Sequence, residues 1–260
     1  MKKVILALAS LAAFSGSALA ADLAAKPYVK APPPVAPVYN WTGFYIFGGA
    51  GGGVWDANTF DRATGVGTIN SIGQRQGGDG WFGTVGAGYD WQFNNTWVAG
   101  VFADGQFGSM RGTIQDPLAQ ITGTIKNQDN WAGGVRLGYL VAPNVLSYVN
   151  GGYTGSHWSG TTELNLAGFP TAIHTNAFNL NGVFLGGGVE NSLDIFGIHM
   201  PGLFMKTEYR ASWYNSKNIN ELTPVNALVG TDIGFKPFVE TVETSLVYRF
   251  NWTGPAISHY

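Results

Sequence analysis

The sequence predicts an all-β protein, an eight-stranded antiparallel up-and-down transmembrane β-barrel with long outer loops and short periplasmic turns. Three observations lead to this prediction. Apolar and polar side chains alternate along several segments, and short and long connections alternate between those segments. The chain also has 38 glycines and 14% aromatic residues but only 12% charged residues. Soluble domains carry about 25% charged residues, so this composition favours a wall that faces lipid.

The alternation is clearest in the last of these segments, Val242 to Phe250. One register reads Val242, Thr244, Leu246, Tyr248 and Phe250, and the other reads Thr241, Glu243, Ser245, Val247 and Arg249. Successive side chains of a strand point to opposite faces, so the segment has an apolar and a polar face. A soluble sandwich would turn the apolar face toward its core, whereas a membrane barrel turns that face to lipid and keeps the polar face inside.

The N-terminus predicts export. Lys2 and Lys3 precede an apolar run and an Ala18-Leu19-Ala20 cleavage pattern, so residues 1–20 are typical of a secretory signal peptide. The proline-rich residues 21–40 predict a semi-rigid periplasmic linker. We expect the barrel over residues 41–250 and a short C-terminal extension over residues 251–260.

Membrane insertion of the mature chain requires a closed barrel, because no later apolar run reaches the about 20 residues of a spanning helix. The eight expected strands are Gly43–Trp55, Trp81–Gln92, Trp97–Ser109, Asn130–Leu140, Val145–Ser156, Phe178–Glu190, Gly202–Tyr214 and Phe238–Phe250. The short connections are 93–96 and 141–144, the long ones are 56–80, 110–129, 157–177 and 215–237, and 191–201 is longer than a short turn should be. A soluble sandwich has no reason to sort its loops by length, whereas outer-membrane barrels do so.

Tryptophan and tyrosine concentrate near the ends of these segments. Their amphipathic rings prefer the headgroup level of a bilayer, so the sequence predicts two aromatic girdles. The expected members are Trp41, Trp91, Trp97 and Tyr139 at the turn end and Trp55, Trp81, Trp131 and Trp213 at the loop end. The first segment is too apolar on both sides for the sequence to assign its faces.

Three motifs carry a family resemblance: Asn40-Trp41-Thr42-Gly43-Phe44-Tyr45, Arg136-x-Gly138-Tyr139 and Tyr248-Arg249-Phe250. With the signal peptide and the glycine-rich first strand, they resemble the small outer-membrane β-barrel (porin-like, immunogenic surface protein) family of Gram-negative bacteria, which is related to the membrane domain of OmpA. The resemblance implies location in the cell outer membrane and contact with outer-membrane lipids and lipopolysaccharide.

The resemblance also implies recognition by the outer-membrane assembly machinery through a C-terminal signal. That role falls on Leu246, Tyr248 and Phe250. The chain departs from the family pattern because it continues to Tyr260, which would have to replace Phe250 as the terminal aromatic residue.

The polar registers predict a charge network in the lumen. Its expected members are Asp104, Arg136, Glu190, Lys206, Glu208, Arg210, Glu243 and Arg249. Eight strands enclose a space that side chains just fill, and an unpaired charge there is costly. The favoured interpretation is a salt-bridged, closed barrel with a structural and surface-exposed role that supports outer-membrane integrity. The alternative is a gated porin for small solutes.

An outer-membrane lipid-modifying hydrolase is a further hypothesis, because His157 could activate Ser159 if Glu163 oriented the ring. One such triplet in a loop rich in Ser, Thr and Gly is not specific, so we predict no catalytic residues. The remaining histidines share no ligand spacing and cysteine is absent, so no metal or cofactor is predicted. With 14 basic and 16 acidic residues, the chain offers no basic surface for nucleic acid. The sequence does not determine the oligomeric state.

Overall fold

The computed structural model describes residues 40–64, 68–69, 72–116, 121–165, 167–198 and 200–250. The expected signal peptide, the linker up to residue 39 and the C-terminal extension lie outside the described residues. The strands are β1 (Gly43–Ala63), β2 (Gln74–Phe93), β3 (Trp97–Asp116), β4 (Ile121–Ala142), β5 (Val145–Trp158), β6 (Thr161–Asn165), β7 (Pro170–Thr175), β8 (Phe178–Ser192), β9 (Leu203–Tyr214), β10 (Lys217–Leu222) and β11 (Leu228–Arg249). One short 3-10 helix, η1 (Leu193–Phe196), lies in the connection between β8 and β9. In the described part of the chain no helix is long and apolar enough to cross a membrane.

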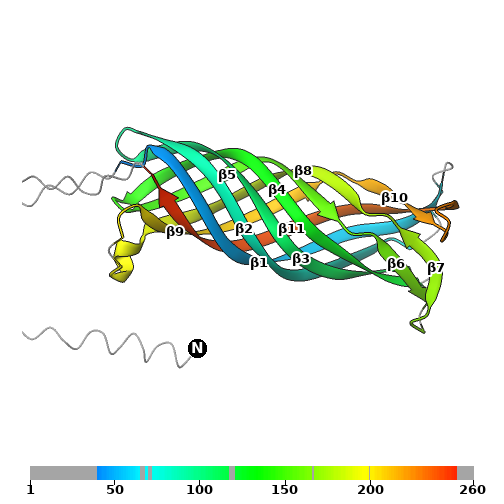
Figure 1. The fold of residues 1–260 in the computed structure, drawn as a ribbon. Coiled ribbons are helices and arrows are strands. Elements are labelled where there is room, and N and C mark those ends of the chain that lie inside the picture. The colour runs from blue at the N-terminus through cyan, green and yellow to red at the C-terminus, as the bar shows by residue number, and fades with distance from the viewer. Residues whose placement is uncertain are drawn as a thin grey trace, which may run out of the picture. The chain divides into compact units, whose positions relative to one another are not determined.

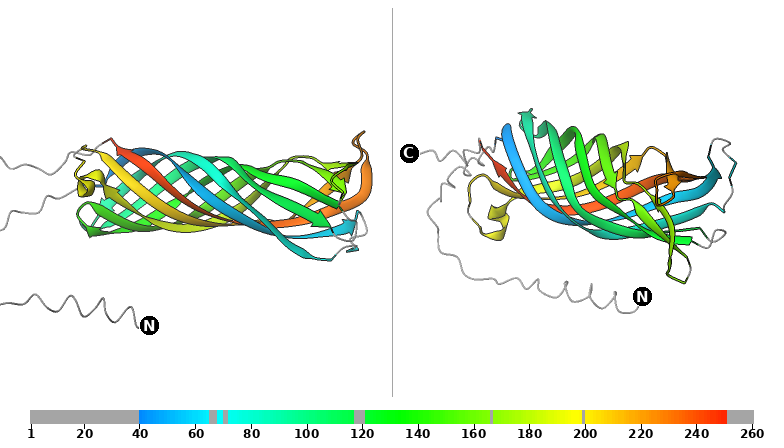
Figure 2. Two further views of the ribbon diagram at one scale, coloured as in Figure 1. Left: turned by 90° about the horizontal axis from the view of Figure 1, so that it is seen from below. Right: turned by 45° about the vertical axis from the view of Figure 1, so that its right-hand side comes forward.

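The strands close into an antiparallel barrel (Figure 1). Around the wall the order is β1, β2, β3, β4, β5, β8, β9 and β11, and β11 pairs again with β1 from Tyr45↔Arg249 to Ala63↔Thr231. This ring of eight strands confirms the predicted up-and-down barrel. The strands run obliquely around the barrel axis (Figure 2), as closure of a sheet into a barrel requires.

Short turns join the strands at one end of the barrel. Asn94 and Asn95 connect β2 to β3 with φ of 51° and 61°, the left-handed backbone that two-residue hairpin turns need. The chain enters and leaves the barrel wall at this same end, since the backbone N–H of Phe250 donates to the carbonyl of Phe44 at 3.1 Å. Because short turns are periplasmic in such barrels, the opposite end faces outward.

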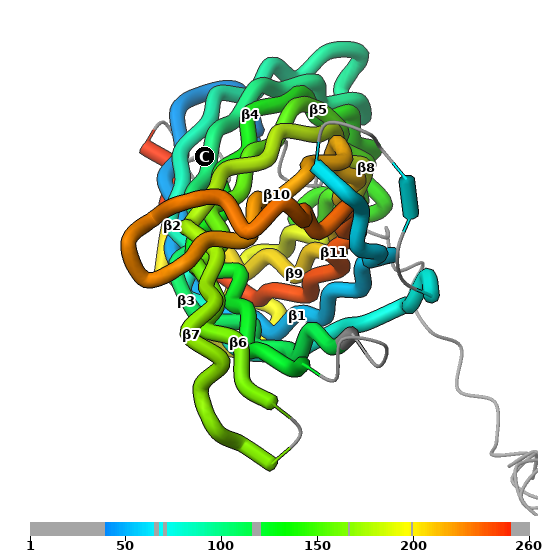
Figure 3. Tube along the Cα trace, turned by 90° about the vertical axis from the view of Figure 1, so that its right-hand side faces the viewer, coloured from blue at the N-terminus to red at the C-terminus, as the bar shows by residue number. Residues whose placement is uncertain are grey.

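Three wall strands are interrupted toward the outer end. Breaks at residues 159–160, 176–177 and 215–216 separate β5 from β6, β7 from β8, and β9 from β10. The wall nevertheless stays closed, because β6 pairs with β4, β7 joins β6 to β10, and β10 pairs with β11. Figure 3 looks along the barrel from this end.

Several strands are much longer than the sequence predicts, and most of the added length lies toward the outer end. β1 continues to Ala63 instead of Trp55, and β11 begins at Leu228 instead of Phe238. At about 3.3 Å per residue, the 21 residues of β1 extend over about 70 Å, far more than a tilted strand needs to cross an apolar band about 25 Å tall. Much of each predicted long loop is therefore sheet that continues the barrel beyond the membrane. Its outer face meets water, so its polarity resembles that of a loop.

Burial follows the inverted pattern that the sequence predicts. Leu137 and Leu246 point outward and are 44% and 53% exposed, whereas Glu190 is fully buried. The structure also assigns the faces of β1: Phe44 is exposed and Tyr45 is buried. An apolar exterior around a charged interior is the arrangement of a barrel in lipid.

Glycines on the inner face make room for large rings in the narrow lumen. Gly86 is the cross-strand partner of Phe47 and Gly88 is that of Tyr45. A Cβ at either glycine would overlap the facing ring. A Cβ at Gly133 would instead have no atom within 4 Å.

We expect Gly86→Ala to destabilise the barrel by about 1–3 kcal/mol, the usual cost of overpacking a filled core. Gly133→Ala is the matched control and should leave stability unchanged. Urea unfolding in detergent, followed by tryptophan fluorescence, measures the difference. Equal unfolding midpoints for the two variants would contradict the close packing of Phe47 against β2.

Candidate functional site

Two arginines and two carboxylates form the first charged group of the lumen, nearer the periplasmic end. Arg136 Nε donates to Asp90 Oδ1 at 2.8 Å, a second contact joins the same two groups, and Arg136 Nη1 donates to Glu190 Oε2 at 3.0 Å. Arg249 Nη2 lies 2.7 Å from Glu190 Oε1 and 2.9 Å from Asp90 Oδ2. All four residues are at most 5% exposed. Forked arginine–carboxylate contacts of this kind are the strong form of a charge-assisted hydrogen bond.

A second charged group lies further toward the outside. Arg210 donates two hydrogen bonds to Asp104, of 2.9 and 2.7 Å, and one to Glu208, of 2.9 Å. Lys206 Nζ lies 3.1 Å from Glu243 and 3.7 Å from Glu208. The period of two along β9 directs Lys206, Glu208 and Arg210 inward together.

Neutral donors complete this second group. Gln106 Nε2 donates to Glu243 at 3.2 Å, and the Tyr148 hydroxyl donates to Glu208 at 2.8 Å. Aromatic rings also cover the cations: Lys206 Nζ lies 3.5 Å from the centre of the Phe47 ring. Such contacts lower the cost of burying these charges.

The structure brings all eight predicted network residues into the lumen and pairs each of them with an opposite charge. It adds Asp90, which the predicted network lacks. Asp90 lies on β2 between the exposed Trp91 and the half-buried Tyr89, so it belongs to the polar register of that strand. This register could have identified Asp90 as a lumen residue from the sequence.

Aromatic and aliphatic side chains fill the lumen on both sides of the charges. On the outer side Trp158 contacts Trp55 and Phe235, with ring centres 5.2 and 5.0 Å apart. On the periplasmic side Trp41 packs against Phe204 at 5.1 Å. The charged groups are therefore enclosed between two apolar layers.

Two predicted girdle members are wrong, because Trp41 and Trp55 are only 1% and 2% exposed and lie inside the barrel. The period of two places Trp55 in the inward register of β1 with Tyr45 and Phe47. Trp41 precedes β1, and its ring lies 4.4 Å from the guanidinium of Arg249. The other six predicted members are 40–80% exposed on the outer wall: Trp81, Trp91, Trp97, Trp131, Tyr139 and Trp213.

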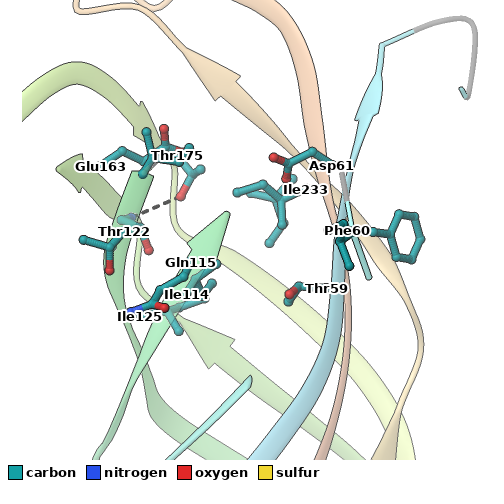
Figure 4. A pocket seen from close by; sticks show the side chains of 15 residues that line it. Thr59, Phe60, Asp61, Ile114, Gln115, Thr122, Ile125, Glu163, Thr175 and Ile233 are labelled. Atoms are coloured by element: carbon teal, nitrogen blue, oxygen red, sulfur yellow. Dashed lines mark hydrogen bonds between the residues drawn. The ribbon is translucent and has the colours of Figure 1, made fainter. Parts of the chain in front are cut away.

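A small pocket lies inside the barrel at its outer end (Figure 4). Its lining combines isoleucines, such as Ile114 and Ile233, with polar residues, such as Thr59, Thr175 and Glu163. The cavity measures about 20 Å³, room for about one water molecule. This part of the lumen is therefore packed as well.

The structure does not join His157 and Ser159 into a nucleophilic pair. His157 Nδ1 is hydrogen bonded to Asn179 Oδ1 at 2.6 Å. The Ser159 hydroxyl accepts from the backbone N–H of Lys126 at 3.0 Å. Within the described residues no group of three or more His, Cys, Asp or Glu side chains could hold a metal ion.

The fold and the lumen define a class: a small transmembrane β-barrel of the outer-membrane type. No family model matches the chain. The chain is 31% identical over 260 residues to the 31 kDa outer-membrane immunogenic protein of Brucella melitensis biotype 1, covering 96% of this chain and 100% of the relative. The same figures hold for the protein of that name from Brucella suis biovar 1. The chain therefore belongs to the family of the 31 kDa outer-membrane immunogenic protein, and it is located in the outer membrane.

A solved structure shares the fold. The outer membrane protein OprG from Pseudomonas aeruginosa matches with a TM-score of 0.50 and 9% identity, covering 81% of this chain and 98% of that chain. At this identity the likeness concerns the fold alone.

We expect Arg136→Ala to destabilise the barrel by about 3–5 kcal/mol, because it leaves buried carboxylates without their partner. Arg75→Ala is the control, since the Arg75–Asp56 pair lies on the exposed outer wall and should contribute nothing measurable. The free energy of unfolding in detergent micelles tests both variants. An unfolding midpoint of Arg136→Ala equal to that of the parent would exclude a role for this ion pair in stability.

Proposed function

We propose that the protein is a closed, non-conducting barrel that stabilises the outer membrane and carries a rigid sheet surface beyond it. The filled lumen is the observation that supports this proposal. Two ion-paired groups lie between aromatic layers, with Trp158 fully buried on one side and Trp41 1% exposed on the other.

The closed state is favoured over a gated pore on energetic grounds. A solute path along the axis would have to separate pairs such as Arg210–Asp104 and also displace packed rings such as Trp158. Breaking one buried pair typically costs about 3–5 kcal/mol. A gate would need a ligand or field that repays several such costs together.

The surface role is supported by the extended strands. β1, β3, β4 and β11 are 20–22 residues long, so they carry the sheet beyond the membrane. The name of the Brucella relatives, an outer-membrane immunogenic protein, fits a surface that is accessible from outside. The displayed surface would then be mostly ordered strand.

Folded protein in planar bilayers should give no discrete current steps, because its lumen is filled from Trp41 to Trp158. The heat-dependent shift in gel migration that intact barrels show verifies the folded state of the same sample. Reproducible single-channel steps from that sample would favour the gated porin instead.

Single cysteines provide an independent measurement, since the chain contains none. Asn150→Cys places a thiol in the lumen, where Asn150 is 4% exposed. A charged, water-soluble thiol reagent should leave it unmodified in the native barrel and modify it after unfolding. Lys236→Cys on the exposed wall is the control and should react in both states. Rapid modification of the native Asn150→Cys protein would show an open lumen.

We also propose that Leu246, Tyr248 and Phe250 form the signal recognised by the assembly machinery. All three face outward at the end of β11 and are 45–55% exposed, so they are accessible to a partner from outside the barrel. Phe250→Ala should lower the fraction of protein that reaches the outer membrane in heat-modifiable form. Leu137→Ala, an outward residue on β4, should not. Equal fractions would contradict this role for Phe250.

A further inference from the structure

The outer wall carries two neighbouring cations where β3 and β4 leave the membrane. Arg111 and Lys126 are direct cross-strand partners. Both side chains face outward, because Met110 and Ile125 beside them are buried inside at 1% exposure. Like charges directly opposite each other on a sheet are destabilising. An anion bound between them would convert this repulsion into attraction.

Two other basic residues of the outer half, Arg62 and Arg75, have carboxylate partners that this pair lacks. Arg62 lies 3.2 Å from Asp232 and Arg75 lies 2.7 Å from Asp56. Arg111 instead donates through Nε to the Ser109 hydroxyl at 3.3 Å. In the described part of the chain, neither Arg111 nor Lys126 has a carboxylate within 4 Å.

Asp79 is the nearest acidic residue in register, since it faces Arg111 from β2. It lies on the side away from Lys126, so the row Asp79–Arg111–Lys126 carries one net positive charge. Asp79 should therefore weaken an anion site here without abolishing it.

Two hydroxyl donors adjoin the cations. Thr113 and Thr124 are the next outward-facing partners along β3 and β4, and both are exposed. With Arg111 and Lys126 they form a two-by-two set of donors, which we call the β3–β4 patch. Cross-strand Cβ atoms lie about 5 Å apart, so one tetrahedral oxyanion can reach several of these donors.

Trp81 indicates where the patch lies relative to the bilayer. Trp81 is 80% exposed and faces Ser109, two residues before Arg111 on β3. Two residues span about 6.6 Å along a strand, and the headgroup layer on each side of a bilayer is about 5–8 Å thick. The patch therefore lies beyond the outer aromatic girdle, on the side of the lipid headgroups. Exposed Phe107 lies on the same wall below it, beside its exposed cross-strand partner Asp129.

We propose that the β3–β4 patch binds the phosphomonoester headgroup of an anionic lipid in the outer leaflet. A phosphomonoester carries up to two negative charges and three acceptor oxygens, which match two cations and two hydroxyls. Arg111 and Lys126 supply charge, Thr113 and Thr124 supply neutral hydrogen bonds, and the wall below takes the acyl chains. The site goes beyond the closed-barrel function, because it would serve equally well on a conducting barrel.

Binding of the full chain in detergent micelles to bisphosphorylated lipid A tests the proposal. Arg111→Gln/Lys126→Gln should weaken binding by roughly tenfold or more, as expected for the loss of charge-assisted hydrogen bonds. Asp79→Asn should tighten binding, because it removes the opposing charge. The matched control, Lys217→Gln/Lys236→Gln, removes the same charge from exposed positions elsewhere and should bind like the parent.

Three further probes separate the sources of the phosphate. Phosphatidic acid should compete for the site, whereas phosphatidylcholine and inorganic phosphate at the same concentration should not. All variants should keep the heat-modifiable gel shift, which shows that the barrel is folded. An equal loss of lipid A binding in the patch and control variants would reduce the effect to net charge and overturn the proposal. Competition by inorganic phosphate alone, or unchanged binding by Asp79→Asn, would also overturn it.

Discussion

Pairing of charge in a space without bulk water is the constraint on which the rest of this structure depends. In the two charged groups of the lumen, five carboxylates and four cations each lie within reach of an opposite charge. An ion removed from water is tolerated only with close, hydrogen-bonded partners. The strand register must therefore be unique, because a slip of one residue would turn the charges of that strand toward lipid.

The same narrow lumen determines the packing around the charges. Large rings fit only where the facing strand has glycine, as at Phe47 and Gly86 or Tyr45 and Gly88. The rings in turn lie over the cations, with Arg136 4.4 Å from the centre of the Tyr45 ring. The abundance of glycine and the low charge content are thus two consequences of one geometry. A filled, ion-paired interior also explains why the proposed function is mechanical.

Outside the membrane the barrel changes its environment without changing its architecture. The inward register passes from ion pairs to isoleucines such as Ile114 and Ile233, while the outward register passes from apolar residues to Arg111, Thr113 and similar polar side chains. The transition on the outer wall occurs just beyond Trp81. The surface that the protein presents to its surroundings is consequently continuous with the rigid membrane-spanning sheet.

The sequence by itself determined the closed barrel, its strand order, its inverted polarity and eight members of the charge network. These follow from the period of two, the alternation of short and long connections and the composition, none of which needs knowledge of distant contacts. Tertiary structure decided the features that depend on the neighbouring strand. It placed Trp41 and Trp55 inside, recruited Asp90 to two arginines, and extended β1 to Ala63. Whether a tryptophan at a strand end is buried, which charge an acid pairs with and how far a polar strand continues depend on the residues that face them from other strands. Local alternation of polar and apolar residues does not encode those contacts.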